Sequence, residues 1–170
     1  VATGELVRRS GEALPGAVFL GLDRSADGGA AVRSRLEADP ALKARVDQAL
    51  AWLVEDGATA SDALLVLLAD LEAEGPAALV VDMVEQGLDE PTQEALIAYL
   101  RRRRPDAHPL FLMTRSCAIL DLAAVGPGET IIFCPANHSP PICVIPHPGA
   151  PGYEAVATCL APNEVQARTE

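Results

Sequence analysis

The chain has 170 residues, of which 49% are hydrophobic and only 4% are aromatic. This length suits one domain, and the aliphatic content predicts a core of Leu, Val, Ile and Ala side chains. The formal net charge is −11 and the sequence pI is near 4.6. An acidic surface of this kind repels phosphate, so the composition argues against nucleic-acid binding by this chain.

The sequence also predicts the cellular location of the protein. No apolar run reaches the roughly 18–20 residues that a membrane-spanning helix requires. The first residues, 1–16, include Glu5, Arg8, Arg9 and Glu12 and lack an apolar stretch, so we expect no signal peptide. We therefore expect a cytoplasmic protein with reduced cysteines. The chain begins with valine, which leaves open a trimmed chain, an unusual start codon or a missing upstream region.

Hydrophobic periodicity predicts helices and strands that alternate along the chain. The expected helices span 5–14, 30–38, 40–55, 60–74, 91–103, 116–122 and 153–160. The expected strands span 17–22, 77–82, 110–114, 130–134 and 142–145. This alternation predicts an α/β fold with a mostly parallel sheet and flanking helices, in a single domain over residues 1–170. In such sheets ligands bind at the carboxyl ends of the strands.

The most informative segment is 79–90, LVVDMVEQGLDE, in which an apolar strand ends in an acid. The pattern is typical of a buried central strand with a carboxylate at its carboxyl end. An Asp in this position can hold Mg²⁺ beside nucleotide phosphates, and Asp82 matches that role. Asp89 follows in a Gly-Leu-Asp sequence, where it also suits the N-cap of the next helix.

Two further segments complete a pattern. Residues 109–116, PLFLMTRS, are followed by AILD at 118–121, and an apolar helix at 59–68 precedes the acidic strand. Together they resemble the second half of an ABC-type ATPase domain over residues 57–122, with the later elements at 129–161 compatible. The segments are similar to that family's signature helix, Walker B strand, D-loop and switch strand. The switch strand is similar to that of the soluble, SMC-like or overcoming-lysogenisation-like members of the family.

This resemblance implies a partial P-loop NTPase-like domain that binds ATP and Mg²⁺ and acts by nucleotide-gated association. Asp82 would hold Mg²⁺, Thr114 would belong to the nucleotide site, and Arg115 would contact the γ-phosphate. Thr59 and Asp89 would meet the opposite subunit. Partners would be a second copy or a missing N-terminal half.

The sequence departs from the family pattern at several points. Met83 stands where the family has its catalytic Glu, and Glu85 is the candidate to replace it. Arg115 stands in place of the switch His, and it cannot accept a proton. The signature is reduced to Ala-Thr-Ala at 58–60, and no G-x-x-x-x-G-K-[ST] loop occurs. We therefore expect weak or absent hydrolysis, with ATP bound only if an upstream half supplies the loop. The alternative is a non-enzymatic interaction or oligomerisation module that has lost nucleotide binding.

Each feature also has an ordinary structural interpretation. Asp82 could cap a turn, Asp89 could serve only as a helix cap, and Arg115 could be an exposed cation. The run Arg101–Arg104 ends a helix, where cations favourably meet the helix dipole, and we prefer this interpretation to a nucleic-acid patch.

A second constellation combines Cys134, His138, Cys143 and His147 in the spacing C-x3-H-x4-C-x3-H. All four residue types bind zinc, but the spacing matches no standard finger or knuckle. Two of the cysteines lie in or beside apolar strands, where a thiol behaves as a small hydrophobe. We therefore expect packed thiols and no zinc.

Overall fold

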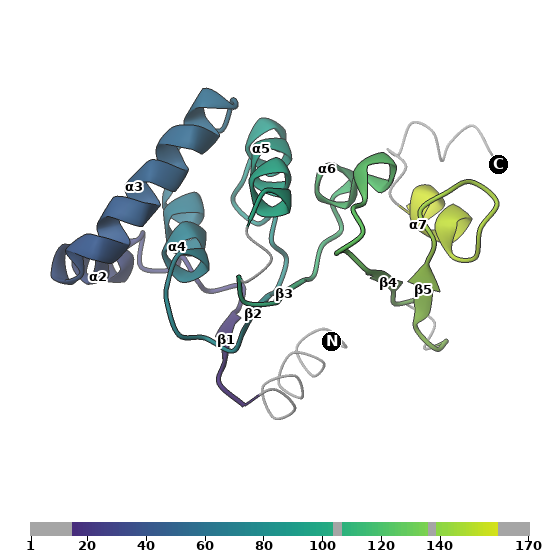
Figure 1. Cartoon of the computed structure of the whole chain (residues 1–170), viewed down its shortest axis with the longest axis horizontal. Coiled ribbons are helices and arrows are strands. Elements are labelled where there is room, and N and C mark those ends of the chain that lie inside the picture. Colours follow the sequence, from purple (N-terminus) through teal and green to yellow (C-terminus); the bar gives the residue numbers. More distant parts are fainter. Residues whose placement is uncertain (1–14, 104–106, 136–138, 160–170) are drawn as a thin grey trace. The chain divides into compact units, whose positions relative to one another are not determined.

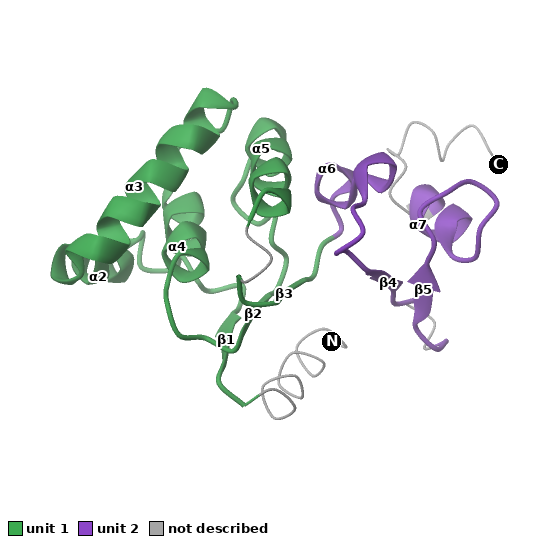
Figure 2. Ribbon diagram, viewed as in Figure 1, with its two compact units in different colours: residues 1–114 green, residues 115–170 purple. Residues whose placement is uncertain are grey.

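The computed structural model of the chain describes residues 15–103, 107–135 and 139–159. Figure 2 colours its two compact units, residues 1–114 and residues 115–170. Each unit contains its own sheet. The expected single domain over 1–170 stays a prediction, and the helix expected at 5–14 lies outside the described residues.

Unit 1 contains a three-stranded parallel sheet in the order β1-β2-β3. Its elements are β1 (Ala17–Leu20), α2 (Ala30–Ala38), α3 (Pro40–Glu55), α4 (Asp62–Leu71), β2 (Ala78–Val81), α5 (Glu90–Arg101) and β3 (Leu110–Leu112). Figure 1 shows α2 to α5 gathered on one side of the sheet. Right-handed crossovers that proceed in one direction place their helices in this way. The α/β class and the parallel sheet with flanking helices are thus confirmed.

The middle strand β2 is the centre of the core, because all four of its residues are buried. Helix α4 contributes most of the rest, with six of its ten residues buried. The largest fully buried side chains are Leu53, Leu64, Leu67, Leu68, Leu71, Leu79 and Leu96. Each such leucine stabilises the fold by roughly 1.5–3 kcal/mol through burial of apolar surface. The predicted aliphatic core is therefore confirmed.

Side-chain caps define where the main helices begin. Asp39 accepts from the Leu42 amide at the start of α3, and the following proline lies in the first turn. The helix expected at 60–74 starts later than predicted, because Ser61 caps α4 by accepting from the Leu64 amide. The Thr59 hydroxyl is engaged elsewhere, so α4 begins at residue 62 instead of 60.

Unit 2 is smaller and its sheet is antiparallel. It contains α6 (Cys117–Leu120), a 3-10 turn (Leu122–Ala124), β4 (Ile131–Phe133), β5 (Ile142–Val144) and α7 (Tyr153–Cys159). The two last predicted strands exist, but they pair with each other in a sheet separate from β1–β3. Only a short connection separates them, and this favours an antiparallel hairpin over a parallel crossover.

The longest helix in the described part of the chain is α3, with 16 residues. A membrane-spanning helix needs about 20 predominantly apolar residues. Among the described helices, none combines the necessary length and apolarity.

Candidate functional site

The candidate site lies where the three parallel strands of unit 1 end. Their carboxyl ends share one edge of the sheet, so the segments that follow them lie close together. Hydrogen bonds join these segments directly: the Asp82 amide donates to Leu20 O over 2.9 Å, and the Val84 amide donates to Met113 O over 3.0 Å. The edge predicted from the sequence to carry the chemistry therefore exists.

Asp82 is the buried acid of this edge, with only 6% of its surface exposed. Its Oδ1 atom is buried and has no hydrogen-bond partner among the described residues. The interpretation as a turn cap therefore fails for this oxygen. A buried polar atom without a partner is costly, and it is a common sign of a missing ion, water or ligand.

Glu85 and Thr114, which follow β2 and β3 in the chain, are in direct contact. The Thr114 hydroxyl donates to Glu85 Oε2 over 2.8 Å. The contact joins the loop after β2 to the end of β3 and fixes both side chains. The structure thus brings together two residues that the sequence assigned separately to catalysis and to nucleotide binding.

Met83, which follows Asp82 at the end of β2, has an unusual backbone. Its φ is +46°, and it is the one non-glycine residue with positive φ in the described part of the chain. Such a conformation is uncommon for a bulky residue and costs free energy. A thioether cannot polarise water, so this position supplies no general base.

Arg24, in the loop after β1, is a site residue that the sequence analysis missed. Its guanidinium donates to the main-chain oxygens of Asp82 over 2.7 Å and of Met83 over 2.8 Å. Burial lowers its pKa, while the nearby carboxylates of Glu85 and Asp82 oppose that shift. An arginine stays protonated in proteins, so this is a permanent cation at the strand ends. The available signal was its position, four residues after the end of β1.

Thr59 and Asp89 meet each other within the chain. Asp89 Oδ2 accepts from the Thr59 hydroxyl over 2.8 Å, and Asp89 Oδ1 accepts from the Thr92 amide over 3.0 Å. Hydrogen bonds from Thr92, then from Thr59, lower the pKa of the Asp89 carboxyl. The N-cap interpretation of Asp89 is confirmed, and it caps α5.

The loop after β1 begins α2 without leaving an open anion site. The Asp27 carboxylate accepts from the amides of Ala31, over 2.7 Å, and of Gly29, over 3.0 Å. The amide of Ala31 is the main cause that lowers the pKa of Asp27. The chain's own carboxylate therefore occupies the place where a helix N-terminus would bind phosphate. The Gly28-Gly29 sequence is not a phosphate cradle.

A pocket of about 440 Å³ opens beside this loop. Its charged lining residues are Asp23, Arg24, Asp27, Arg35 and Asp70. Two of them form an ion pair, with Arg35 Nη1 2.6 Å from an Asp70 carboxylate oxygen. Three carboxylates against two guanidinium groups make the pocket a poor host for phosphate.

Arg115 is exposed and begins unit 2, whereas Asp82 and Thr114 belong to unit 1. Its expected contact with a γ-phosphate stays a prediction.

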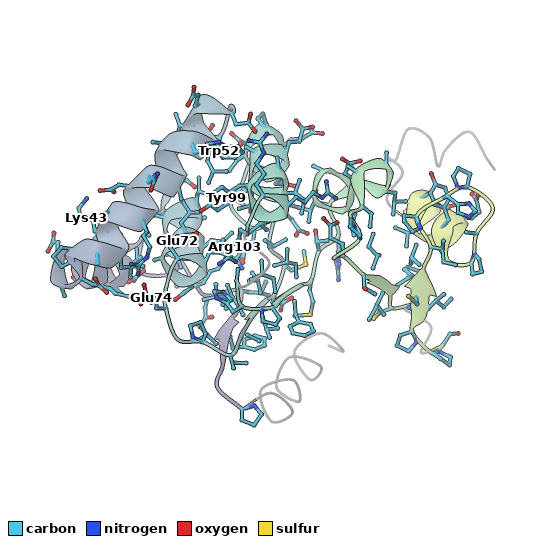
Figure 3. The ribbon with its side chains drawn as sticks, in the orientation of Figure 1. Lys43, Trp52, Glu72, Glu74, Tyr99 and Arg103 are labelled. Atoms are coloured by element: carbon cyan, nitrogen blue, oxygen red, sulfur yellow. The ribbon has the colours of Figure 1, made fainter. Side chains whose placement is uncertain are left out.

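The arginine run at the end of α5 has structural contacts. Arg102 lies over the Trp52 ring at 4.7 Å from its centroid, and Arg103 donates to Leu71 O over 2.7 Å. Figure 3 labels the surrounding cluster, in which Tyr99 and Trp52 come from α5 and α3. Tyr99 also donates to Glu72 over 2.7 Å. These contacts tie the helix ends together, which supports the structural interpretation of the run.

The zinc constellation gains nothing from the structure. Cys134 and Cys143 are exposed, so the expectation of packed thiols is wrong. His138 lies outside the described residues. Within the described residues, no three ligand side chains come together as a metal site would require.

In comparisons with family models, curated proteins and solved structures, nothing matches this chain. The resemblance to ABC-type ATPases therefore rests on the motifs alone.

Proposed function

We propose that this chain is part of an ATP-binding module of the ABC type, with weak or absent hydrolysis, which acts by nucleotide-gated association in the cytoplasm. The observation that carries the proposal is the buried carboxylate oxygen of Asp82, which has no partner among the described residues at the end of the central strand. A carboxylate at this position is what a Mg²⁺-nucleotide site of the P-loop type requires.

The donor set fits Mg²⁺ in chemistry. Mg²⁺ takes oxygen ligands and is held by one or two carboxylates together with water and substrate phosphates. Asp82 would hold it, and Glu85 and Thr114 offer further oxygen atoms at the same edge. When bound, the ion would neutralise charge on the phosphates. Arg24 adds a permanent positive charge next to the same loop.

The proposed weak hydrolysis follows from the side chains near Asp82. Met83 has a thioether side chain, which cannot activate water. Glu85 is the nearest acid in the sequence, and it accepts a hydrogen bond from Thr114. A carboxylate held in this way is better suited to orient a ligand than to remove a proton from water.

Association would use the surface that carries Thr59 and Asp89. Their hydrogen bond fixes a hydroxyl and a carboxylate next to the start of α5. Both residues are exposed, as a contact with a second copy or a missing N-terminal half requires. Arg115 would contact the γ-phosphate in the closed state.

Calorimetric titration with Mg²⁺-ATP tests the proposal, on this chain and on a longer chain that includes any in-frame upstream residues. We expect binding by the longer chain, and loss of most of that binding in its Asp82→Asn variant. The same variant of this chain serves as the control for folding. Absence of binding by both chains would contradict the proposal.

The alternative is a non-enzymatic interaction module, and the surface of unit 2 favours it. Ile132, Ile142 and Ile145 in and beside the β4–β5 pair are 60%, 38% and 47% exposed. Isolated two-stranded sheets with exposed apolar side chains are marginal in water. Light scattering of the nucleotide-free protein tests this alternative: a stable oligomer that Ile132→Ser disperses would support it, and a monomer would contradict it.

A further inference from the structure

The loop after β2 concentrates main-chain oxygens around one cation from another part of the chain. Besides its short contacts to Asp82 and Met83, the Arg24 guanidinium lies 3.2 Å from Gln86 O and 3.4 Å from Val84 O. It also lies 3.3 Å from Gly21 O in its own loop. Each hydrogen bond described for Arg24 is to a carbonyl oxygen, none to a carboxylate.

Convergent carbonyls of this kind form a cation site. The loop turns sharply at Met83, with φ +46°, so that successive oxygens face the same point. Unopposed, these dipoles would repel one another and the nearby Asp82 carboxylate. The planar fork of the guanidinium matches several acceptors at once, which the single ammonium of lysine does not do.

The arrangement has a consequence for Asp82. Because the donors of Arg24 are directed to carbonyls, the cation lies close to the acid without forming a salt bridge with it. The Oδ1 atom stays unpartnered while the positive charge offsets part of the cost of burying it. The loop is thereby held in one conformation with its acid available to a ligand.

We infer that Arg24 is a positioning residue, which fixes the loop of residues 82–86 by filling its carbonyl cage and so keeps the Asp82 carboxylate poised for a divalent cation. The part that concerns the cation rests on the proposed function. The part that concerns the loop does not, and it is measured without any ligand.

Chemical rescue tests the inference. Amide hydrogen exchange would be measured at Val84, Gln86 and Leu88 in the wild type and in Arg24→Ala. We expect exchange at these amides to accelerate by about tenfold or more, since a hydrogen bond to a charged group is lost. Millimolar methylguanidinium, which fits the vacated cage, restores slow exchange, whereas methylammonium does not. Arg33→Ala is the matched control, because Arg33 donates to Gly28 O from the exposed surface.

The possible outcomes test the role of Arg24 in the loop separately from the binding of a divalent cation. Unchanged exchange in Arg24→Ala, or rescue by methylammonium as well, would overturn the inference. If Arg24→Ala does not fold, Arg24→Lys gives the same readout, with faster exchange expected because lysine lacks the fork. In Arg24→Ala, Mn²⁺ binding, measured by electron paramagnetic resonance, should weaken as amide exchange in the loop accelerates. Methylguanidinium should restore the binding. A wild type that binds no Mn²⁺ would contradict the proposed function, while the exchange data would still decide the role of Arg24.

Discussion

The loops that follow β1 and β2 leave the same edge of the sheet, yet they are built in opposite ways. The first, residues 21–29, is mostly exposed or half-buried and satisfies its helix with its own Asp27. The second, residues 82–89, buries Val84 completely and takes its main hydrogen-bond donor from the first loop. The second, more tightly built loop contains Asp82, whose buried Oδ1 atom has no hydrogen-bond partner in the described part of the chain. The difference indicates that Asp82 is held in place by its surroundings and is not a loosely packed surface residue.

The largest expected difference between the loops concerns their glycines. Both Gly87 and Gly28 have positive φ, at +76° and +62°. A Cβ at position 87 would lie 2.9 Å from the Ala63 Cβ, whereas a Cβ at position 28 would meet nothing within 4 Å. We expect Gly87→Ala to lower the free energy of unfolding by about 3 kcal/mol, from strain plus overpacking. Gly28→Ala should cost about 1 kcal/mol, from strain alone.

Urea denaturation of the two variants measures this difference. Equal losses of stability would mean that the second loop is no more tightly packed than the first, and the comparison would fail.

The next effect concerns the buried acid. Asp82→Asn keeps the shape of the side chain and removes its charge, so without divalent cations we expect the free energy of unfolding to rise by about 1 kcal/mol. With Mg²⁺ present, the wild type should gain stability and the variant should not. Thermal unfolding with and without Mg²⁺ measures both effects. Asp23→Asn, at an exposed acid of the first loop, is the matched control and should change neither quantity.

A smaller effect is expected from relief of strain at Met83. Glycine adopts positive φ without penalty, so Met83→Gly should raise the free energy of unfolding by about 0.5–1 kcal/mol. Met113, also half-buried, has no positive φ, and Met113→Gly should lower stability. Urea denaturation distinguishes the two signs, and a loss of stability in both variants would contradict the account of the second loop.

The smallest expected effect concerns acid pH. Asp27 accepts from an amide in the first turn of α2 and Asp89 caps α5, and hydrogen bonds lower the pKa of both carboxyls. A lowered folded-state pKa contributes stability above the unfolded value, near 3.9, that is lost as the pH falls through the folded pKa. We therefore expect amide protection at Ala31 and Thr92 to decline below about pH 4. In Asp27→Asn the Ala31 amide should lose this pH dependence; if it keeps the dependence, the Asp27 carboxylate is not its cause.

Much of the fold was predictable, because the local sequence patterns of the helices and strands match the side chains that the structure buries. The span of α3 follows from its proline and its apolar spacing, and the burial of β2 follows from its continuous apolar run. Asp89 as a cap was predictable for the same reason. The start of α4 was predicted two residues too early, because Ser61 caps the helix and Asp89 accepts from the Thr59 hydroxyl across a distant segment.

Only those residues of the candidate site that belong to one continuous sequence motif were predictable. Asp82 stands out in the sequence, but the role of Arg24 depends on contacts across 58 or more residues. No local pattern encodes such pairings, since they arise when β1 and β2 align in the sheet. The antiparallel pairing of β4 and β5 was missed because alternation alone does not state which strands share a sheet.

The most direct test of the central claim is a crystal structure of this chain grown with Mn²⁺, a substitute for Mg²⁺ that is visible by anomalous scattering. The account predicts an anomalous peak at roughly 2.1 Å from the Asp82 carboxylate, a distance typical of such ions. Arg24 would still hold the neighbouring carbonyls. A well-ordered Asp82 without a peak, or a peak only at other acids, would contradict the claim that this edge is a divalent-cation site.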